Sequence, residues 1–262
     1  MMNMKTFFTV ENGSNNGIEH FTVKSKAIGN RVDVSVYKPA GEFENLPVVI
    51  LLHGVYGSHW AWSLKAEVHL TLKQKIDKGE LPPMMLVMPS DGLFQDGSAY
   101  LPHHTANYEK WISHEVPELI KEQFQEVGEI SPFFLAGLSM GGYGALRIGA
   151  KYPEVFKAFS GLSSITFFDE FEHFVEDFDA LKAAVIKEEK VFDIIDENKR
   201  KLAPFRFDCG SKDTLYGGNV SLHEQLKEAK IAHEFYTYEG EHTWEYWKEN
   251  IAETLQFFAK QL

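Results

Sequence analysis

The sequence predicts an α/β fold in which a mainly parallel, doubly wound sheet carries helices on both faces. Apolar runs alternate with longer helix-forming stretches along most of the chain, as in strands joined by crossover helices. Residues 48–52 and 84–88 are continuously apolar, which is typical of strands buried on both faces. Because α/β enzymes of this length, 262 residues, commonly have one core, a single domain over 1–262 is expected.

The first elements follow from alternation and turn residues. Residues 18–25 and 32–37 alternate between apolar and polar side chains, and residues 28–30 supply a turn between them. This pattern predicts an antiparallel hairpin at the edge of the sheet. After it come the strand over 48–52, a helix over 63–78, the strand over 84–88 and a helix over 107–126.

One segment, residues 164–203, interrupts the alternation of the second half and is predicted to form a small cap-like insertion. Phe167, Phe171, Phe174 and Phe178 recur there at spacings of four, three and four, with acidic residues between them. The spacing predicts an amphipathic helix whose aromatic face either joins the core, the favoured interpretation, or lines an acyl pocket. Around the insertion we expect strands over 133–136, 155–160, 205–209 and 234–238 and helices over 142–150, 220–230 and 244–260.

Charge and cysteine content exclude several classes of function. Lys and Arg total 26 against 38 Asp and Glu, a net charge of −12, which argues against nucleic-acid and anionic-membrane partners. With Cys209 alone, neither an internal disulfide nor a cysteine metal cluster can form. Residues 1–17 lack the order of a secretory signal, and no run approaches about 20 apolar residues, so a cytoplasmic location is expected. His103 and His104 are adjacent on an irregular loop, a spacing that disfavours a metal site.

The sequence Gly-Leu-Ser-Met-Gly, residues 137–141, lies between the apolar run 133–136 and the helix predicted over 142–150. In a strand-turn-helix context this pattern is a nucleophile elbow, where flanking glycines permit a strained turn that exposes the serine. Ser139 would be the nucleophile, and the Met140 N–H at the helix N-terminus would face an oxyanion. The alternative is a Gly/Ser-rich loop without chemistry.

Two further side chains complete a hydrolytic set. Asp213 and His242, like Ser139, each follow a predicted strand, so a parallel sheet gathers all three at one edge. Serine needs a neutral imidazole to take its proton, and a carboxylate then stabilises the imidazolium. The chain order of nucleophile, acid and base is that of α/β-hydrolases. Asp208 is an alternative acid, but it lies inside the strand, where it would point into a sheet face.

The loop over 53–58 follows the strand over 48–52 and contains two glycines. It could lend the backbone N–H of Val55 to an oxyanion hole shared with Met140, or it could be a plain tight turn. His53 is interpreted as a residue that shapes this loop. Cys209 is interpreted as a small buried residue rather than a nucleophile.

The combination of motifs resembles the esterase D family, which includes S-formylglutathione hydrolases and bacterial tributyrin-type and feruloyl-type esterases. The matching stretches are Gly-Leu-Ser-Met-Gly-Gly-Tyr-Gly-Ala over 137–145, Leu-Leu-His-Gly over 51–54 and Gly-Glu-His-Thr-Trp over 240–244. The similarity extends from about residue 20 onward. It implies an α/β-hydrolase fold, carboxylic-ester hydrolysis without a cofactor, and the three residues derived above as the triad.

Within that family, thiol-ester hydrolases usually carry a Ser-Gly-Leu-Thr-Cys type sequence where this chain has His-Gly-Val-Tyr-Gly over 53–57. The departure favours the bacterial simple-ester branch. The expected function is a serine carboxylesterase for short acyl esters, with acetylated sugars and aryl or feruloyl esters as candidates. S-formylglutathione hydrolysis, acyl transfer and a non-catalytic binding module are alternatives, and a homo-oligomer fits the symmetry common among such enzymes.

Overall fold

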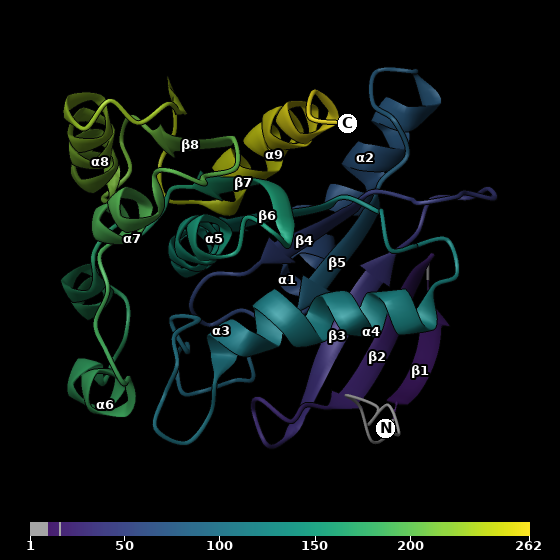
Figure 1. The fold of residues 1–262 in the computed structure, drawn as a ribbon, viewed down its shortest axis with the longest axis horizontal. Coiled ribbons are helices and arrows are strands. Elements are labelled where there is room, and N and C mark those ends of the chain that lie inside the picture. The colour runs from purple at the N-terminus through teal and green to yellow at the C-terminus, as the bar shows by residue number, and fades with distance from the viewer. Residues whose placement is uncertain (1–9, 16) are drawn as a thin grey trace.

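A sheet runs through the whole molecule (Figure 1). The computed structural model describes residues 10–15 and 17–262, and within them nine strands pair in the order β1-β2-β3-β5-β4-β6-β7-β8-β9. The first three strands and β5 pair antiparallel, and all pairs from β5 to β9 are parallel. The strands are β1 (Val10–Asn15), β2 (Ile18–Lys24), β3 (Arg31–Tyr37), β4 (Val48–Leu52), β5 (Met85–Pro89), β6 (Phe133–Leu138), β7 (Phe156–Leu162), β8 (Phe205–Gly210) and β9 (Glu234–Tyr238).

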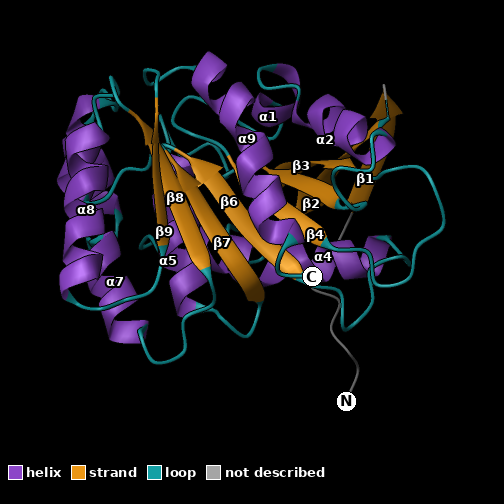
Figure 2. Ribbon diagram, turned by 90° about the horizontal axis from the view of Figure 1, so that it is seen from above, coloured by secondary structure: helices purple, strands orange, loops and turns teal. Residues whose placement is uncertain are grey.

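Helices cover both faces of this sheet (Figure 2), which confirms the predicted fold class. The core beneath α1, α2 and α9 takes Val49 and Leu51 from β4, whereas the core beneath α4, α5, α7 and α8 takes Ile50 and Leu52, as the two-residue strand period requires. The helices are α1 (Ala61–Leu64), α2 (Val68–Asp77), α3 (Tyr108–Lys110), the π-helical turn η1 (Trp111–Glu115), α4 (Val116–Gln123), α5 (Met140–Lys151), the 3₁₀ helix η2 (Phe168–His173), α6 (Phe178–Ala184), α7 (Val191–Asn198), α8 (Tyr216–Glu228) and α9 (Trp244–Ala259).

The predicted hairpin forms, but it does not lie at the edge of the sheet. β2 and β3 pair antiparallel with Ile18 opposite Tyr37, and β1 adds a further strand outside β2. The prediction missed β1 because its sequence, Val-Glu-Asn-Gly-Ser-Asn, has no apolar alternation. Backbone pairing alone makes it a strand.

The helix predicted over 63–78 is wrong as one element, since it divides into α1 and α2. Glu67 between them has φ 49°, a left-handed conformation that a continuous right-handed helix cannot contain. The helix predicted over 107–126 is confirmed, with a π-helical turn η1 inside it. Pro117 follows this turn, where its missing N–H costs no α-helical hydrogen bond to the preceding turn.

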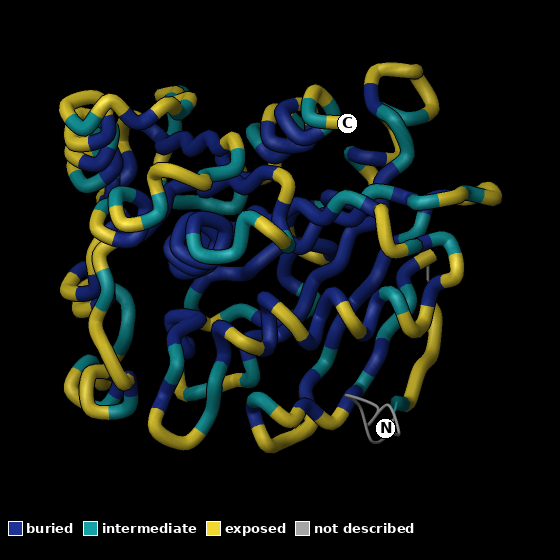
Figure 3. Tube along the Cα trace, viewed as in Figure 1, coloured by how far each residue is buried: buried dark blue, intermediate teal, exposed yellow. Residues whose placement is uncertain are grey.

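The amphipathic helix predicted across Phe167 to Phe178 is also wrong. The 3₁₀ helix η2 ends at His173, and Asp177 begins α6 by accepting a hydrogen bond from the Ala180 N–H at 2.9 Å. The four phenylalanines therefore share no face. Of these four, Phe171 is buried in the core and Phe174 and Phe178 pack against it partly buried, whereas Phe167 is 39% exposed. α6 lies largely on the surface, and α5 is buried along its length (Figure 3).

Candidate active site

Ser139 occupies a sharp turn between β6 and α5. Its φ of 54° and ψ of −117° lie outside the helical and strand regions, a conformation that costs about 1–3 kcal/mol. A Cβ at Gly137 would lie 2.2 Å from the Gly141 carbonyl oxygen, and one at Gly141 would lie 2.3 Å from the Leu52 oxygen. Only glycine fits at either position, so the turn depends on the motif's glycines.

The structure brings the three predicted side chains into one hydrogen-bonded row. Ser139 Oγ lies 3.0 Å from His242 Nε2, and His242 Nδ1 lies 3.0 and 2.9 Å from the two carboxylate oxygens of Asp213. An Nδ1–H that donates to the carboxylate leaves Nε2 free to accept the serine proton. The loops after β6, β8 and β9 supply these residues, and all three strands are parallel.

Asp213 is held as an ionised acceptor. Burial opposes ionisation of its carboxyl, but the hydrogen bond and charge of His242, together with the N–H of Leu215 at 2.8 Å, hold its pKa below the usual value. Backbone hydrogen bonds from Ser211 N–H to the Tyr238 carbonyl and from Lys212 N–H to the Gly240 carbonyl join the loops after β8 and β9. These bonds fix the position of the Asp213 carboxylate relative to the His242 imidazole.

The alternative acid, Asp208, has other partners. The buried Asp208 side chain on β8 accepts hydrogen bonds from Tyr246 at 2.8 Å and from Arg206 at 3.0 Å. Burial raises the pKa of its carboxyl to about 6. The structure pairs His242 with Asp213 instead.

Cys209 is fully buried, and this burial raises the pKa of its thiol, as expected for a structural cysteine.

The loop after β4 orients the peptide group of Val55. The Gly54 carbonyl accepts hydrogen bonds from the Gly57 N–H at 3.2 Å and from His53 Nδ1 at 2.7 Å. His53 Nε2 accepts the Asp91 N–H at 3.1 Å, so Nδ1 carries the proton that His53 donates. A trans peptide directs C=O and N–H oppositely, so the Val55 N–H points away from those two donors, and within the described residues it has no acceptor.

The proposed oxyanion donors are neighbours. A Cβ at Gly97 would lie 2.3 Å from Met140 Sδ and 3.5 Å from Val55 Cγ1, so both side chains pack on that glycine. A Cβ at Gly54 would lie 3.4 Å from Ser139 Cβ. Two backbone segments, one after β4 and one after β6, therefore meet beside the serine, as an oxyanion hole requires.

Two aromatic residues flank His242. Trp247 was not considered from the sequence, and Phe174 was considered only as part of an aromatic face that could line an acyl pocket. The Phe174 ring lies 5.2 Å from the imidazole at an angle of 34°, and Trp247 meets it edge-on at 4.9 Å. Trp247 lies on the first turn of α9, close in sequence to His242. Phe174 comes from the insertion, and no local spacing indicates its position over the imidazole.

The two adjacent loop histidines do not converge. His103 is buried and its Nε2 donates to the Ser98 carbonyl at 3.0 Å, whereas His104 is exposed. In the part of the chain that the structure describes, no group of three or more His, Cys, Asp or Glu side chains is arranged to hold a metal ion.

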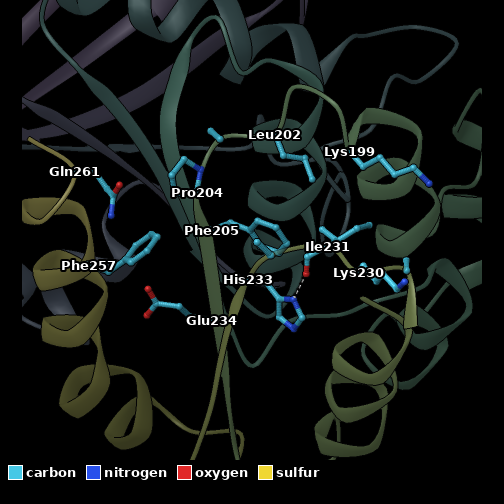
Figure 4. A pocket seen from close by; sticks show the side chains of 13 residues that line it. Lys199, Leu202, Pro204, Phe205, Lys230, Ile231, His233, Glu234, Phe257 and Gln261 are labelled. Carbon is cyan, nitrogen blue, oxygen red and sulfur yellow. Dashed lines mark hydrogen bonds between the residues drawn. The ribbon is translucent and has the colours of Figure 1, made fainter. Parts of the chain in front are cut away.

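A hollow of about 620 Å³ lies away from Ser139. Pro204, Phe205, His233 and Glu234 at the amino-terminal ends of β8 and β9 line it (Figure 4), and His233 Nδ1 donates to the Ile231 carbonyl there. The triad loops follow the carboxyl ends of the strands, so the hollow belongs to the opposite edge of the sheet.

Comparison with known proteins agrees with this geometry. The model of a family described as "Putative esterase" matches residues 25–258. The chain belongs to this esterase family. It is a hydrolase of carboxylic esters, and the resemblance expected from its motifs is confirmed. No helix among the described residues combines the length and apolar composition that a membrane span requires.

Individual relatives of this esterase cover most of its length. It is 27% identical over 237 residues to an acetyl esterase of Caldicellulosiruptor saccharolyticus, covering 83% of this chain and 85% of the relative. A ferulic acid esterase structure superposes with a TM-score of 0.79 at 22% identity, covering 97% and 99% of the two chains. A fluorophosphonate-binding serine hydrolase of Staphylococcus aureus gives 0.79 at 20% identity, covering 92% and 98%. The structural likenesses show the α/β-hydrolase fold.

Proposed function

We propose that this esterase hydrolyses short-chain acyl esters through an acyl-enzyme intermediate, with Ser139, His242 and Asp213 as nucleophile, base and acid. The observation that carries the proposal is the row of hydrogen bonds from Ser139 Oγ through His242 to the Asp213 carboxylate. Such a row activates a serine that is otherwise a weak nucleophile.

In the first half of the reaction, Ser139 Oγ attacks the ester carbonyl carbon while its proton moves to His242 Nε2. The tetrahedral oxyanion would accept hydrogen bonds from the Val55 and Met140 N–H groups, each worth about 3 kcal/mol when removed. Collapse breaks the bond to the alcohol oxygen, which takes the proton from Nε2. Water, activated by the same imidazole, then attacks the acyl-serine and releases the acid.

The charge on Asp213 supports these steps. Because its pKa is held below the usual value, the carboxylate stays ionised at neutral pH and stabilises the imidazolium that forms twice per turnover. The N-terminus of α5, which begins at Met140, adds a partial positive charge beside the oxyanion.

The close packing around the serine supports small acyl groups. Ser139 is 2% exposed, so little space beside the nucleophile is open to a long acyl chain. The acetyl esterase relative supports acetylated substrates, and aryl or feruloyl esters remain in the proposal because of the ferulic acid esterase neighbour. We also propose a cytoplasmic location, supported by the single buried thiol, and a homo-oligomer.

The deciding experiment is hydrolysis of p-nitrophenyl acetate and butyrate by the wild type and by Ser139→Ala. The variant should lose at least about 10³-fold in kcat. Ser221→Ala, which changes an exposed serine on α8, is the matched control and should keep the wild-type rate. Equal turnover by Ser139→Ala and the wild type would refute the mechanism, and rapid hydrolysis of p-nitrophenyl decanoate would refute the short-chain preference.

A further inference from the structure

The insertion is tied to the loop region beside the oxyanion donors. The Tyr56 hydroxyl donates to the Phe174 carbonyl, and the Glu176 N–H donates to Asp96 Oδ2 at 2.8 Å. Asp96 also accepts the Tyr56 N–H on its carbonyl oxygen at 2.9 Å. These contacts join three segments that are far apart in sequence. The four residues Tyr56, Asp96, Phe174 and Glu176 are called the latch below.

The latch holds the backbone on both sides of Val175, next to the Phe174 ring. With its carbonyl bonded to Tyr56, Phe174 extends its ring over His242 at 5.2 Å, while Trp247 supports the imidazole edge-on at 4.9 Å. Ser139 beneath is 2% exposed, although Tyr56 itself is 64% exposed. Because Tyr56 is exposed and its hydroxyl donates to the Phe174 carbonyl, its role is to connect two loops and not to pack in the core.

The chemistry decides which part of the substrate meets Phe174. The leaving alcohol oxygen must receive a proton from His242 Nε2, so the alcohol part of the ester lies beside the imidazole. Phe174 flanks that imidazole. We propose that Phe174 is a specificity-determining residue that bounds the alcohol side of the substrate, and that the latch holds it there. This inference rests on the proposed esterase mechanism.

A class of substrate follows from this boundary. A small alcohol or a flat aromatic one fits beside the Phe174 ring, because an aromatic ring offers a planar apolar contact. A bulky, non-planar alcohol has to displace Phe174 and break the hydrogen bonds from Tyr56 and Glu176. The esterase therefore prefers acetates of small or aryl alcohols over acetates of bulky alicyclic ones, and among the candidate substrates named above this favours aryl acetates over acetylated sugars.

The test keeps the acyl group constant and varies the alcohol, using phenyl acetate and menthyl acetate. Phe174→Ala should raise the ratio of kcat/KM for menthyl over phenyl acetate by about tenfold or more. Tyr56→Phe, which loses only the hydroxyl, should raise it by about threefold or more. The ratio for p-nitrophenyl butyrate over acetate should stay within about twofold in both variants, because the acyl side is not bounded by Phe174.

Phe167→Ala is the matched control, since Phe167 belongs to the same insertion but is 39% exposed; its ratios should equal those of the wild type. Unchanged alcohol ratios in both latch variants would overturn the proposal, and so would an acyl ratio that shifts as much as the alcohol ratio. If Phe174→Ala does not fold, the alcohol ratio of Tyr56→Phe, a change at an exposed position, tests the proposal by itself. Failure of the proposed esterase mechanism gives a different result, because the wild type would then hydrolyse phenyl acetate no faster than Ser139→Ala.

Discussion

At the scale of single residues, the reaction depends on a strained serine held by its neighbours. Ser139 keeps φ at 54° because its N–H donates to the Leu162 carbonyl at 2.9 Å and its own carbonyl accepts the Tyr143 N–H at 3.0 Å. The strain of about 1–3 kcal/mol is offset by this packing. Glycines at 137 and 141 allow the start of α5 to approach the ends of β6 and β4 closely.

A methyl group at position 141 should disrupt the turn. In Gly141→Ala the added Cβ would lie 2.3 Å from the Leu52 oxygen and 2.6 Å from the His53 oxygen, so β4 and α5 must separate. We expect a loss of about 10²-fold in kcat on p-nitrophenyl acetate and about 1–3 kcal/mol in unfolding free energy by urea titration. Gly217→Ala in α8 has nothing within 4 Å of the new Cβ and should not destabilise the fold; equal behaviour of the two variants would contradict the close-approach argument.

Asp208 should leave a pH signature on stability. Its folded pKa, raised by burial to about 6, exceeds the value of 3.8 for an exposed carboxyl, so the folded state binds the proton more tightly. The stability that protonated Asp208 contributes is therefore fully present only well below pH 3.8 and is lost as pH rises through 6, a change of about 3 kcal/mol. The difference in unfolding free energy between wild type and Asp208→Asn should fall by most of that amount between about pH 3 and 7; a flat difference would contradict the assignment.

At the scale of elements, the insertion is anchored to the helix that carries the nucleophile. Arg147 on α5 is fully buried and bonds Glu109 at 3.0 Å and Glu189, which lies between α6 and α7. Lys151 bonds the same two carboxylates at 2.8 Å. The latch holds the first half of the insertion, and the ion pairs of Arg147 and Lys151 with Glu189 hold its second half. Both halves are therefore tied to the hydrolase core.

Removing the central cation should loosen the anchor. Arg147→Met leaves Glu109 and Glu189 buried with Lys151 alone, and we expect a loss of about 3–5 kcal/mol in unfolding free energy, measured by urea titration. Amide exchange should rise over residues 186–190. Lys73→Met breaks an exposed pair with Asp77 and should change stability by less than about 1 kcal/mol. Similar losses in both variants would show that burial does not strengthen the cluster.

At the scale of the whole molecule, the net charge of −12 should influence which esters approach. A negative surface repels anions, and salt screens that repulsion with a Debye length of about 10 Å at 0.1 M. We expect kcat/KM for the anionic ester 4-acetoxybenzoate to rise about two- to fivefold between 10 and 300 mM NaCl, while that for neutral phenyl acetate stays constant. A parallel response of both esters would rule out electrostatic repulsion as the cause.

The sequence anticipated much of the architecture. Continuous apolar runs located the buried strands, and the parallel arrangement put residues 139, 213 and 242 at one sheet edge, where the structure joins them by hydrogen bonds. Polar β1 escaped notice because only pairing with β2 makes it a strand. The break at Glu67 was missed because a left-handed backbone at a non-glycine residue has no clear sequence signal.

Local pattern, by itself, determined the fold class, the serine turn and the order of the three triad residues, because hydrophobic period and glycine placement act over a few neighbouring residues. The tertiary structure alone decided that His242 pairs with Asp213 rather than Asp208, that four evenly spaced phenylalanines do not share a helix, and that Phe174 lies over the imidazole. These outcomes depend on contacts between distant segments, such as Tyr56 with Phe174, whose free energy appears only once the sheet brings those segments together.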